Sequence, residues 1–406
     1  MAGPLDGVRV LDFTRVLAGP HCTRMFADLG ADVIKIEPPS GDLTRFAAPR
    51  VNGQATYFVQ QNAGKRNVSI DLSNPRGAQL AADLAGHCDV LIENYRAGVM
   101  KRMGLGPDDL LARYPRLVYA SITGYGATGP WAHRRAYAPV VGAESGLTKA
   151  QGDARGAVYA NDPASHADVY TALETASAVL AALFQREHTG RGQWIDVSMA
   201  ETMLYVNEHL HDQLWDGSVA DGTIRSFSPA DYLVFEVADG TAIVVSGHPA
   251  ERGTFELFLR ALSLEPLADD PRFADVAARQ ANFDELRSTL LAAARSIPDA
   301  ATFEEQFGAH QLAVGVLRTA RELAETDWAR ERGVITEVSD RGDGTIRIPN
   351  PPWHFSDGET AVRGPAHYRG EDNRAVLAEL LGYDDAAIDE LETDGVLTSR
   401  LPSSRT

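Results

Sequence analysis

Residues 8–37, VRVLDFTRVLAGPHCTRMFADLGADVIKIE, decide the fold class. Two apolar, β-rich runs, Val8–Phe13 and Ala31–Glu37, are separated by a helical stretch. Strands alternate with helices in this way when helices cross over between parallel strands. Parallel strands are buried on both faces and are therefore near-continuous apolar runs, as these two are. The stretch predicts a doubly wound α/β fold.

The alternation continues along the chain. Apolar runs predict four more strands, at Asn67–Leu72, Asp89–Glu93, Leu117–Ile122 and Trp194–Met199. Asn74-Pro75 is an N-cap followed by proline at the first helical position, which predicts a helix to about His87. Another helix is expected to start at Pro107. The Ala/Leu-rich stretch Ala167–Glu187 predicts a long helix, which the glycines of Thr189–Gly192 end.

A second unit follows a change of composition. Residues 216–229 are rich in Gly, Ser and Asp and predict a linker. Beyond it, Tyr232–Val237 and Thr241–Ser246 flank Asp239-Gly240, which predicts a β-hairpin because Asp-Gly supplies the positive φ of a tight turn. Amphipathic helices are expected from there to about Ala324. A chain of 406 residues exceeds the size at which one core keeps growing, so two domains are expected.

The chain is acidic, with a formal net charge of −18 and a pI near 5.0. Binding to nucleic acid or to an anionic membrane requires a positive field, so the charge argues against both. An anionic ligand must therefore meet a local cluster of arginine and lysine side chains.

Cysteine usage and the N-terminus suggest the compartment. Only Cys22 and Cys88 are present, which excludes a disulfide framework and a cysteine-rich zinc site and suits a reducing environment. Residues 1–10 lack the basic and apolar regions of a signal peptide, and no apolar run approaches the roughly 18 residues of a membrane span. We expect a cytoplasmic protein that is neither secreted nor membrane-spanning.

Residues 124–129, GYGATG, match the GxGxxG fingerprint of dinucleotide-binding folds and follow a predicted strand. The fingerprint requires its third glycine to lie in a helix whose N-terminus meets the pyrophosphate. Pro130-Trp131 follows immediately, so we expect a glycine-rich active-site or structural loop and no NAD site.

Three other patterns give little support to a function. Gly64-Lys65 lacks the spaced glycine of a P-loop, and residues 142–146 are GAESG, not GxSxG. His209 and His211 lie two apart on a predicted helix and point to nearly opposite sides. A solvated or dimer-facing helix is favoured there, and no metal site is predicted.

Asp168 lies at the start of the predicted helix, within a mostly small and apolar run. Aspartate commonly caps helices, so an N-cap is the simplest interpretation of this residue taken by itself. The surrounding sequence favours a catalytic role instead.

Several motifs together resemble the family III CoA transferases, also called the CaiB/BaiF family. They are LDFT at 11–14, LGADVIKIE at 29–37, ENYR at 93–96, RMG at 102–104 and TGRGQ at 189–193. The resemblance runs from Leu5 to about Met203 and returns from about Gly315 to Tyr383. In this family the catalytic aspartate precedes a helix that leads into LAAL and then TGRGQ, and Asp168 occupies that place.

The resemblance implies a fold and an assembly. It implies a large Rossmann-like CoA-binding domain with a parallel sheet, built from both chain ends, residues 1–215 and 330–406. Residues 216–329 are expected to form the linker and a smaller α+β domain. Two subunits are expected to thread through each other as an interlocked, ring-like homodimer.

The resemblance also assigns the coenzyme site by position. The residues expected to bind CoA are Val16, Leu17, Ala18, Ile70, Ser73, Asn94, Tyr95, Arg96, Arg102 and Arg135. Most follow the carboxyl ends of predicted strands, where open α/β sheets bind ligands, and the arginines supply charge for the CoA phosphates. Pro38 and Ser73 stand where some members have arginine and lysine, which leaves the adenine and phosphate contacts open.

The implied reaction moves CoA from an acyl-CoA to a carboxylic acid through an aspartyl anhydride and an aspartyl-CoA thioester on Asp168. Backbone N–H groups near Leu17 and Ala18 are the candidates for stabilising the oxyanions. The candidate substrate-pocket residues are Tyr125, Tyr137, Tyr232 and His248. Residues 245–249, VSGHP, replace the glycine-only loop of oxalate-using members, which disfavours oxalate and formate.

Two alternatives stay open. An α-methylacyl-CoA racemase or epimerase shares the fold and the CoA site but moves a proton with a His/Asp pair. Racemases carry a histidine where this chain has Tyr137, although His133 and His166 lie nearby in the sequence. The second alternative is a CoA-thioester-binding protein without turnover, which needs the arginines and not Asp168. The sequence does not name the donor or acceptor acids.

Overall fold

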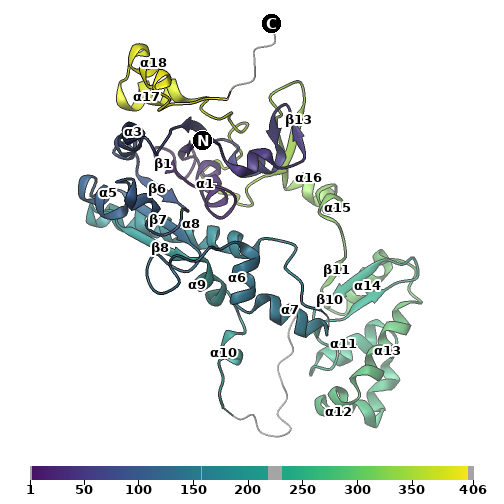
Figure 1. Ribbon diagram of the computed structural model, residues 1–406. Coiled ribbons are helices and arrows are strands. Elements are labelled where there is room, and N and C mark those ends of the chain that lie inside the picture. Colours follow the sequence, from purple (N-terminus) through teal and green to yellow (C-terminus); the bar gives the residue numbers. More distant parts are fainter. Residues whose placement is uncertain (1, 157, 218–230, 401–406) are drawn as a thin grey trace. The chain divides into compact units, whose positions relative to one another are not determined.

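The computed structural model describes residues 2–156, 158–217 and 231–400 (Figure 1). The chain divides into two compact units, Met1–Gln213 with Trp328–Thr406, and Leu214–Asp327. Each unit has a sheet and a hydrophobic core of its own. Most of the linker expected at 216–229 lies outside the described residues.

The first unit is built around a six-stranded sheet. Its strands are β1 (Arg9–Asp12), β2 (Asp32–Glu37), β5 (Arg66–Ser69), β6 (Val90–Glu93), β7 (Val118–Thr123) and β8 (Trp194–Ser198). Two small hairpins are formed by β3 (Arg50–Val51) with β4 (Gln54–Ala55) and by β12 (Ile335–Ser339) with β13 (Thr345–Pro349). The six strands predicted for this sheet are confirmed, with ends that differ by at most three residues.

Helices connect and cover these strands. Those of the first unit are α1 (Ala18–Asp28), α2 (Thr56–Asn62), α3 (Pro75–Ala85), α4 (Val99–Arg102), α5 (Pro107–Arg113), α6 (Ala138–Glu144), α7 (Leu147–Arg155), α8 (His166–Thr189), α9 (Met199–Tyr205), α10 (Leu210–Gln213), α17 (Asn373–Leu381) and α18 (Asp385–Thr393). A short 3-10 helix, η1, covers Leu43–Phe46, and α16 (Asp327–Glu331) lies at the boundary of the units.

The sheet is parallel throughout and has the strand order β5-β2-β1-β6-β7-β8. Counted along the chain, this order is 3-2-1-4-5-6, that of doubly wound dinucleotide-binding folds. The order reverses between β1 and β6, so the loops leaving their carboxyl ends turn to opposite sides and open a crevice. Open α/β sheets bind ligands at such a switch point.

Strand side chains alternate between two cores, one on each face of the sheet. On β1, Val10 packs in the core that contains Phe26 of α1. Its neighbour Leu11 packs in the opposite core with Leu80 of α3 and Leu377 of α17. Each such side chain is buried and contributes about 1.5–3 kcal/mol to folding. The near-continuous apolar strands of the sequence follow from burial on both faces.

Helix ends follow the predicted signals. The Asn74 side chain accepts a backbone hydrogen bond in the first turn of α3, and α8 ends at Gly190, whose φ of 70° is left-handed. After β7, residues 124–129 form a loop, and the next helix begins only at Ala138. The expected glycine-rich loop, without the helix of a dinucleotide fingerprint, is confirmed.

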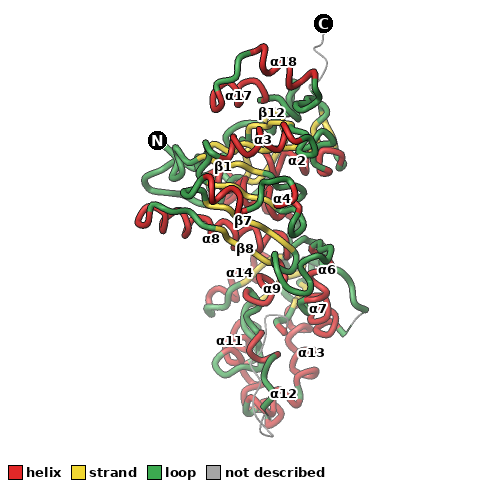
Figure 2. Tube along the Cα trace, turned by 60° about the vertical axis from the view of Figure 1, so that its left-hand side comes forward, coloured by secondary structure: helices red, strands yellow, loops and turns green. Residues whose placement is uncertain are grey.

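Helix α8 is long and apolar enough, by length and composition, to cross a membrane, with a mean hydropathy of 1.3. This differs from the expectation that no apolar run approaches such a length. The helix packs against α1, β7 and β8, beside which it lies in Figures 1 and 2, and its Val179 is fully buried. Apolar core helices of folded proteins have the same composition.

The C-terminal part of the chain covers the edge strand β5. Helix α17 packs on β5, and the Asn373 side chain accepts the Ser69 N–H at 2.9 Å. Beyond the strand end, Ile70 forms a β-bridge with Leu397. Backbone groups at the edge of the sheet are thereby paired by residues about 300 positions away in the chain.

The second unit has a three-stranded antiparallel sheet of order β11-β10-β9, formed by Val314–Val316, Ala242–Val245 and Val234–Glu236. Its helices are α11 (Thr254–Ala261), α12 (Val276–Ala281), α13 (Phe283–Ala294), α14 (Ala300–Ala309) and α15 (Ala320–Ala324), with 3-10 turns η3 (Glu265–Asp269) and η4 (Pro271–Phe273). In its core the Phe303 and Phe307 rings stack, and the Phe235 ring packs at a tilt against both. The predicted hairpin is confirmed, with Gly240 at φ 86°.

Candidate active site

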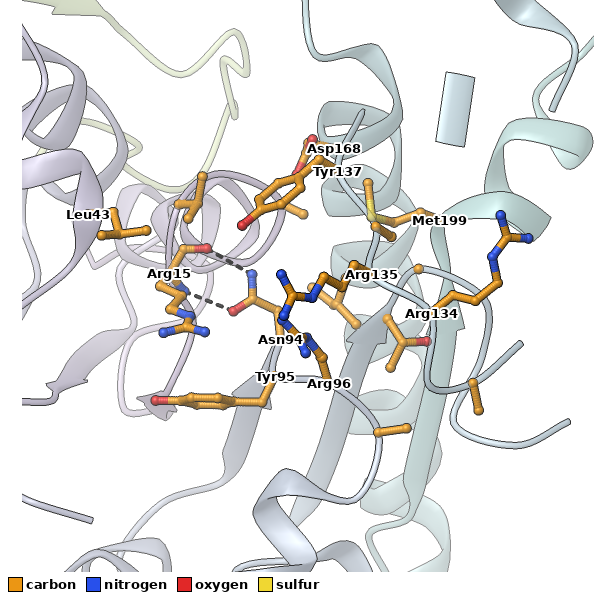
Figure 3. A pocket seen from close by; sticks show the side chains of 18 residues that line it. Arg15, Leu43, Asn94, Tyr95, Arg96, Arg134, Arg135, Tyr137, Asp168 and Met199 are labelled. Carbon is orange, nitrogen blue, oxygen red and sulfur yellow. Dashed lines mark hydrogen bonds between the residues drawn. The ribbon is translucent and has the colours of Figure 1, made fainter. Parts of the chain in front are cut away.

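A cavity of about 140 Å³ lies at the switch point of the parallel sheet (Figure 3). Its walls come from the end of β7, from the loops after β1, β6 and β7, from η1 and from the first turns of α1, α8 and α9. The side chains labelled in Figure 3 are Arg15, Leu43, Asn94, Tyr95, Arg96, Arg134, Arg135, Tyr137, Asp168 and Met199. Four arginines and one aspartate therefore share this cavity, the arrangement expected for an anionic ligand that meets a nucleophile or a base.

The structure brings many of the predicted site residues together. Those that line the cavity are Val16, Ala18, Asn94, Tyr95, Arg96, Arg135, Tyr137 and Asp168. Leu17 is buried next to them, and Ile70 is fully buried in the core of the sheet. Ser73 and Arg102 are exposed and lie outside the lining.

The remaining predicted pocket residues lie elsewhere. Tyr125 is outside the lining and packs edge-on against Trp131, with ring centroids 5.4 Å apart. Tyr232 and His248 belong to the second unit. His248 is buried there, and its Nδ1 accepts the Ala250 N–H at 3.1 Å. The function expected for these three stays a prediction.

Asp168 is the third residue of α8 and is not its N-cap, a position that Ser165 occupies. Burial raises the pKa of Asp168 to about 6, against hydrogen bonds from the backbone of Ala18 and Ala138 that favour the charged form. Ala18 and Ala138 are the first residues of α1 and α6. Two helix N-termini therefore face this carboxylate and stabilise its charge within an environment that opposes it.

The loop after β1 is clamped to the loop after β6. Asn94 Oδ1 accepts the Arg15 N–H at 2.9 Å, and Asn94 Nδ2 donates to the Arg15 carbonyl at 2.8 Å, the dashed lines of Figure 3. Val16 follows with φ 69°, a left-handed conformation that is rare for a β-branched residue and costs on the order of 1–3 kcal/mol. Its N–H donates to Asp42 Oδ2 at 3.2 Å, which helps to hold the strained turn.

A buried ionic cluster of Asp12, Lys35, Asp42 and Lys65 packs against that loop. Lys65 Nζ lies 3.2 Å from Asp12 Oδ2, and Lys35 Nζ lies 3.4 Å from Asp42 Oδ2. All four side chains are almost inaccessible to solvent. Lys35 also donates to the Thr14 carbonyl at 2.6 Å, so the cluster holds the backbone that leads into the cavity.

The pKa values show which charges the cluster stabilises. Burial opposes the charge of Asp12, but Lys65 and Lys35 outweigh it and hold the pKa of Asp12 at about 2. Burial lowers the pKa of Lys65 to about 8, although Asp12 opposes this shift. Both side chains are therefore charged near pH 7, and each compensates the other.

Glu93, the last residue of β6, carries a second buried carboxyl group next to the cavity-lining Asn94. Burial raises the pKa of Glu93 to about 7, while hydrogen bonds from Ser121 and from the Tyr95 N–H favour its charged form. Its Oε2 accepts that N–H at 2.8 Å, which fixes the turn from β6 into Asn94 and Tyr95.

Three residues near the site were missed by the sequence analysis. Arg15 and Arg134 line the cavity, and Tyr57 of α2 lies close enough to Asp168 for the aspartate charge to add to the effect of burial in raising the pKa of the tyrosine. The strand-end rule that selected Val16 applies equally to its neighbour Arg15. No motif marks Tyr57.

The cavity holds no histidine among its 18 lining residues. His166 Nδ1 is hydrogen-bonded to Asp162, and His133 is exposed and outside the lining. Within the described residues, no group of three or more His, Cys, Asp or Glu side chains is arranged to hold a metal ion. Among the described residues, no histidine is thus placed in this cavity to form a proton-transferring pair with Asp168.

Comparison with known proteins gives a consistent result. The model of CoA-transferase family III matches residues 5–373. Succinyl-CoA:glutarate CoA-transferase of Mus musculus is 32% identical over 97% of this chain and 90% of its own length. Acetyl-CoA:oxalate CoA-transferase of Acetobacter aceti is 33% identical over 92% of this chain and 95% of its own. A crystal structure of a CaiB/BaiF family protein from Brucella suis superposes with a TM-score of 0.80, at 30% identity, over 94% of this chain and 100% of that chain.

The buried cluster gives a stability prediction. Asp42→Asn removes the ion-pair partner of Lys35 in a solvent-inaccessible place, so we expect the free energy of unfolding to fall by on the order of 3 kcal/mol. Urea denaturation of the full chain measures it. Asp108→Asn is the matched control, because Asp108 pairs with Lys101 at 3.4 Å on the exposed surface and should change nothing measurable. Equal midpoints for the two variants would show that the buried pair does not support the fold.

Proposed function

Because this chain belongs to CoA-transferase family III, we propose that it moves CoA from an acyl-CoA donor to a small carboxylic acid with Asp168 as the covalent nucleophile. The observation that supports this most is the position of Asp168, a desolvated carboxylate in the arginine-lined cavity at the switch point. Relatives named for glutarate, L-malate and oxalate agree with a carboxylic acid acceptor.

In the proposed reaction, an oxygen of the Asp168 carboxylate attacks the thioester carbonyl carbon of the donor, and the carbon–sulfur bond breaks. The products are a mixed anhydride and the CoA thiolate. The thiolate attacks the aspartyl carbonyl and releases the donor acid, which leaves Asp168 as a CoA thioester. The acceptor carboxylate then displaces the thiolate to form a second anhydride. Attack of the thiolate on the acceptor carbonyl gives the new acyl-CoA and restores Asp168.

Backbone N–H groups are the candidate oxyanion donors. The Ala18 and Ala138 groups already hydrogen-bond to Asp168 in the resting enzyme. The N–H of Leu17, one residue before α1, has no acceptor among the described residues. Donors fixed at helix starts need no reorganisation as charge develops on the tetrahedral intermediate, which is how such groups lower a barrier.

The arginines supply the charge for the CoA phosphates. Within the described residues, Arg96 and Arg135 form no ion pair, so both guanidinium groups are available to an anionic ligand. Arg134 is already paired with Glu144 and lies 4.5 Å above the Trp131 ring. Phosphate binding by guanidinium forks offsets the acidity of the chain as a whole.

We extend the proposal to the assembly, an interlocked homodimer. Leu173, Leu180 and Phe184 of α8 lie at spacings of seven and four residues, which places them on one helix face, and all three are exposed. Phe184 has 71% of its surface accessible, and Tyr205 of α9 has 80%. An apolar stripe of this kind is typical of a surface that another chain covers.

The covalent step is tested by trapping. After incubation with an acyl-CoA donor and hydroxylamine, mass spectrometry should find a hydroxamate on the peptide that contains Asp168. Asp168→Ala should form no adduct, and its turnover rate should fall by on the order of 10⁴-fold or more, while the variant still binds CoA. Asp162→Asn, in the same segment, is the control and should keep the adduct.

Other results would support the alternatives. Solvent deuterium entering the acyl α-carbon without an adduct indicates a racemase. Binding of acyl-CoA without adduct or exchange indicates a binding protein.

The raised pKa of Asp168 gives a pH prediction. Only the carboxylate is nucleophilic, and protonation removes it as the pH falls through about 6, so kcat/KM should drop about tenfold for each unit below that value. Above pH 6 the carboxylate is ionised and the profile should level off. Because the pKa of Glu93 is about 7, Glu93→Gln is needed as a control and should leave the limb near pH 6 in place. An acid limb below pH 4 would assign the nucleophile to a carboxyl without a raised pKa.

Interlocking predicts the absence of subunit exchange. Two differently tagged dimers mixed in native buffer should form no hybrid over days, because linked rings separate only when a chain unfolds. Unfolding and refolding the mixture, or co-expressing the two tags, should produce the hybrid, which native mass spectrometry detects. Hybrid formed on simple mixing would rule out interlocking, and a monomer mass would rule out the dimer.

A further inference from the structure

A second cavity, of about 270 Å³, lies beside the carboxyl ends of β2 and β5, at the edge of the parallel sheet away from Asp168. The 3-10 helix η1 contributes to both cavities: its Leu43 lines the cavity with Asp168, and its Arg45 and Phe46 line the second. Neither the family motifs nor the proposed reaction uses this second cavity.

Four arginines line the second cavity, Arg45, Arg50, Arg369 and Arg400, and no aspartate or glutamate is among its lining residues. The chain as a whole has a formal net charge of −18. A concave surface with charge of one sign focuses the local field and gathers ions of opposite sign. The second cavity is therefore a place where an acidic protein attracts an anion.

Two of these guanidinium groups are fixed by the fold. Arg45 donates from Nε and Nη2 to the carboxylate of Glu37, at 2.9 and 2.6 Å, and lies 3.7 Å above the Phe58 ring. Arg369 donates from Nη1 to Ser69 Oγ at 2.9 Å and from Nη2 to the Ser399 carbonyl at 3.1 Å. Guanidinium groups held in this way lose little freedom when a ligand binds.

The other two arginines are not compensated. Arg50 on β3 and Arg400 near the chain end form no side-chain hydrogen bond or ion pair within the described residues. Burial lowers the pKa of Arg369, and the charges of Arg45 and Arg400 lower it further, so the guanidinium groups repel one another. Glu37 supplies one negative charge against four positive ones. An anion between the arginines would relieve that repulsion.

We propose that the second cavity binds a phosphate group, supplied either by the 3′-phosphate of CoA or by free inorganic phosphate. Several arginine forks around one small cavity match the multiple oxygens of a phosphate dianion better than the two oxygens of a carboxylate. The cavity lies at the ligand-binding edge of the sheet, next to Pro38 and beyond the strand that precedes Ser73.

The CoA source rests on the proposed function, whereas the phosphate site does not, and the experiment separates them. It compares the binding of CoA, dephospho-CoA, which lacks the 3′-phosphate, and inorganic phosphate by calorimetry. The proteins are the wild type, Arg50→Gln/Arg400→Gln and Arg295→Gln. Arg295 is exposed in the second unit and has no ion pair within the described residues, so its variant controls for the lost charge.

If CoA supplies the phosphate, the wild type binds CoA roughly tenfold or more tightly than dephospho-CoA, and the double variant loses that difference. If free phosphate is the ligand, inorganic phosphate binds the wild type and the Arg295 variant but not the double variant, and the ratio of CoA to dephospho-CoA affinity is unchanged. Either result supports the site. Equal binding of all three ligands by wild type and double variant overturns it.

Folding and turnover are read separately. Circular dichroism and the melting temperature check the double variant, and the single variant Arg400→Gln, at an exposed position, repeats the measurement if the double variant is unstable. The readout is binding, so a chain that binds phosphate but forms no Asp168 adduct fails the proposed function and keeps the phosphate site. A chain that forms the Asp168 adduct but binds no phosphate keeps the proposed function and overturns the phosphate site.

Discussion

The first unit depends on the compensation of buried charge at the carboxyl ends of β1 and β2. Asp12 and Lys35 lie at positions that a parallel sheet buries completely, and Lys65 and Asp42 bring one opposite charge to each. An isolated ion there would destabilise the fold by several kcal/mol. Removal of one partner from a formed pair leaves such an isolated ion and therefore has the same effect. The two pairs are thus coupled to the packing of three strands and to the loop that carries Arg15 and Val16.

This cluster explains how a strained loop persists at the switch point. Val16 adopts its left-handed conformation because Asp42 accepts its N–H, and Asp42 is held in turn by Lys35 and by the Thr44 N–H at 3.0 Å. The same loop leads into α1, whose first N–H group meets Asp168. A continuous series of contacts therefore connects the buried ion pairs, through the strained Val16 loop, to the proposed nucleophile.

Short-range patterns were sufficient for the elements and for part of the site. Apolar runs, the Asn74 cap and the Asp-Gly turn located strands and helices because each signal acts within a few residues. Contacts between distant segments could not be predicted this way: Asn373 binds Ser69 across 304 residues, and Arg369 reaches the same strand end. Ser73 and Arg102 lie outside the lining of the cavity with Asp168, and their expected contact with CoA stays a prediction.

The environment of Asp168 balances two opposing requirements of the proposed covalent catalysis. A nucleophile is stronger when poorly solvated, and burial does this but also favours the protonated, unreactive acid. The backbone hydrogen bonds from Ala18 and Ala138 act in the opposite direction and leave the pKa at about 6, low enough for the carboxylate to predominate near pH 7. In the proposed anhydride the aspartyl oxygen that these groups bind has lost its full charge, and it regains charge each time the thiolate or an acid attacks. Hydrogen-bond donors that bind the charged transition states more tightly than the neutral intermediates lower the barriers of all four proposed steps. In this way one carboxylate can serve as nucleophile, acyl carrier and leaving group within a single fixed site.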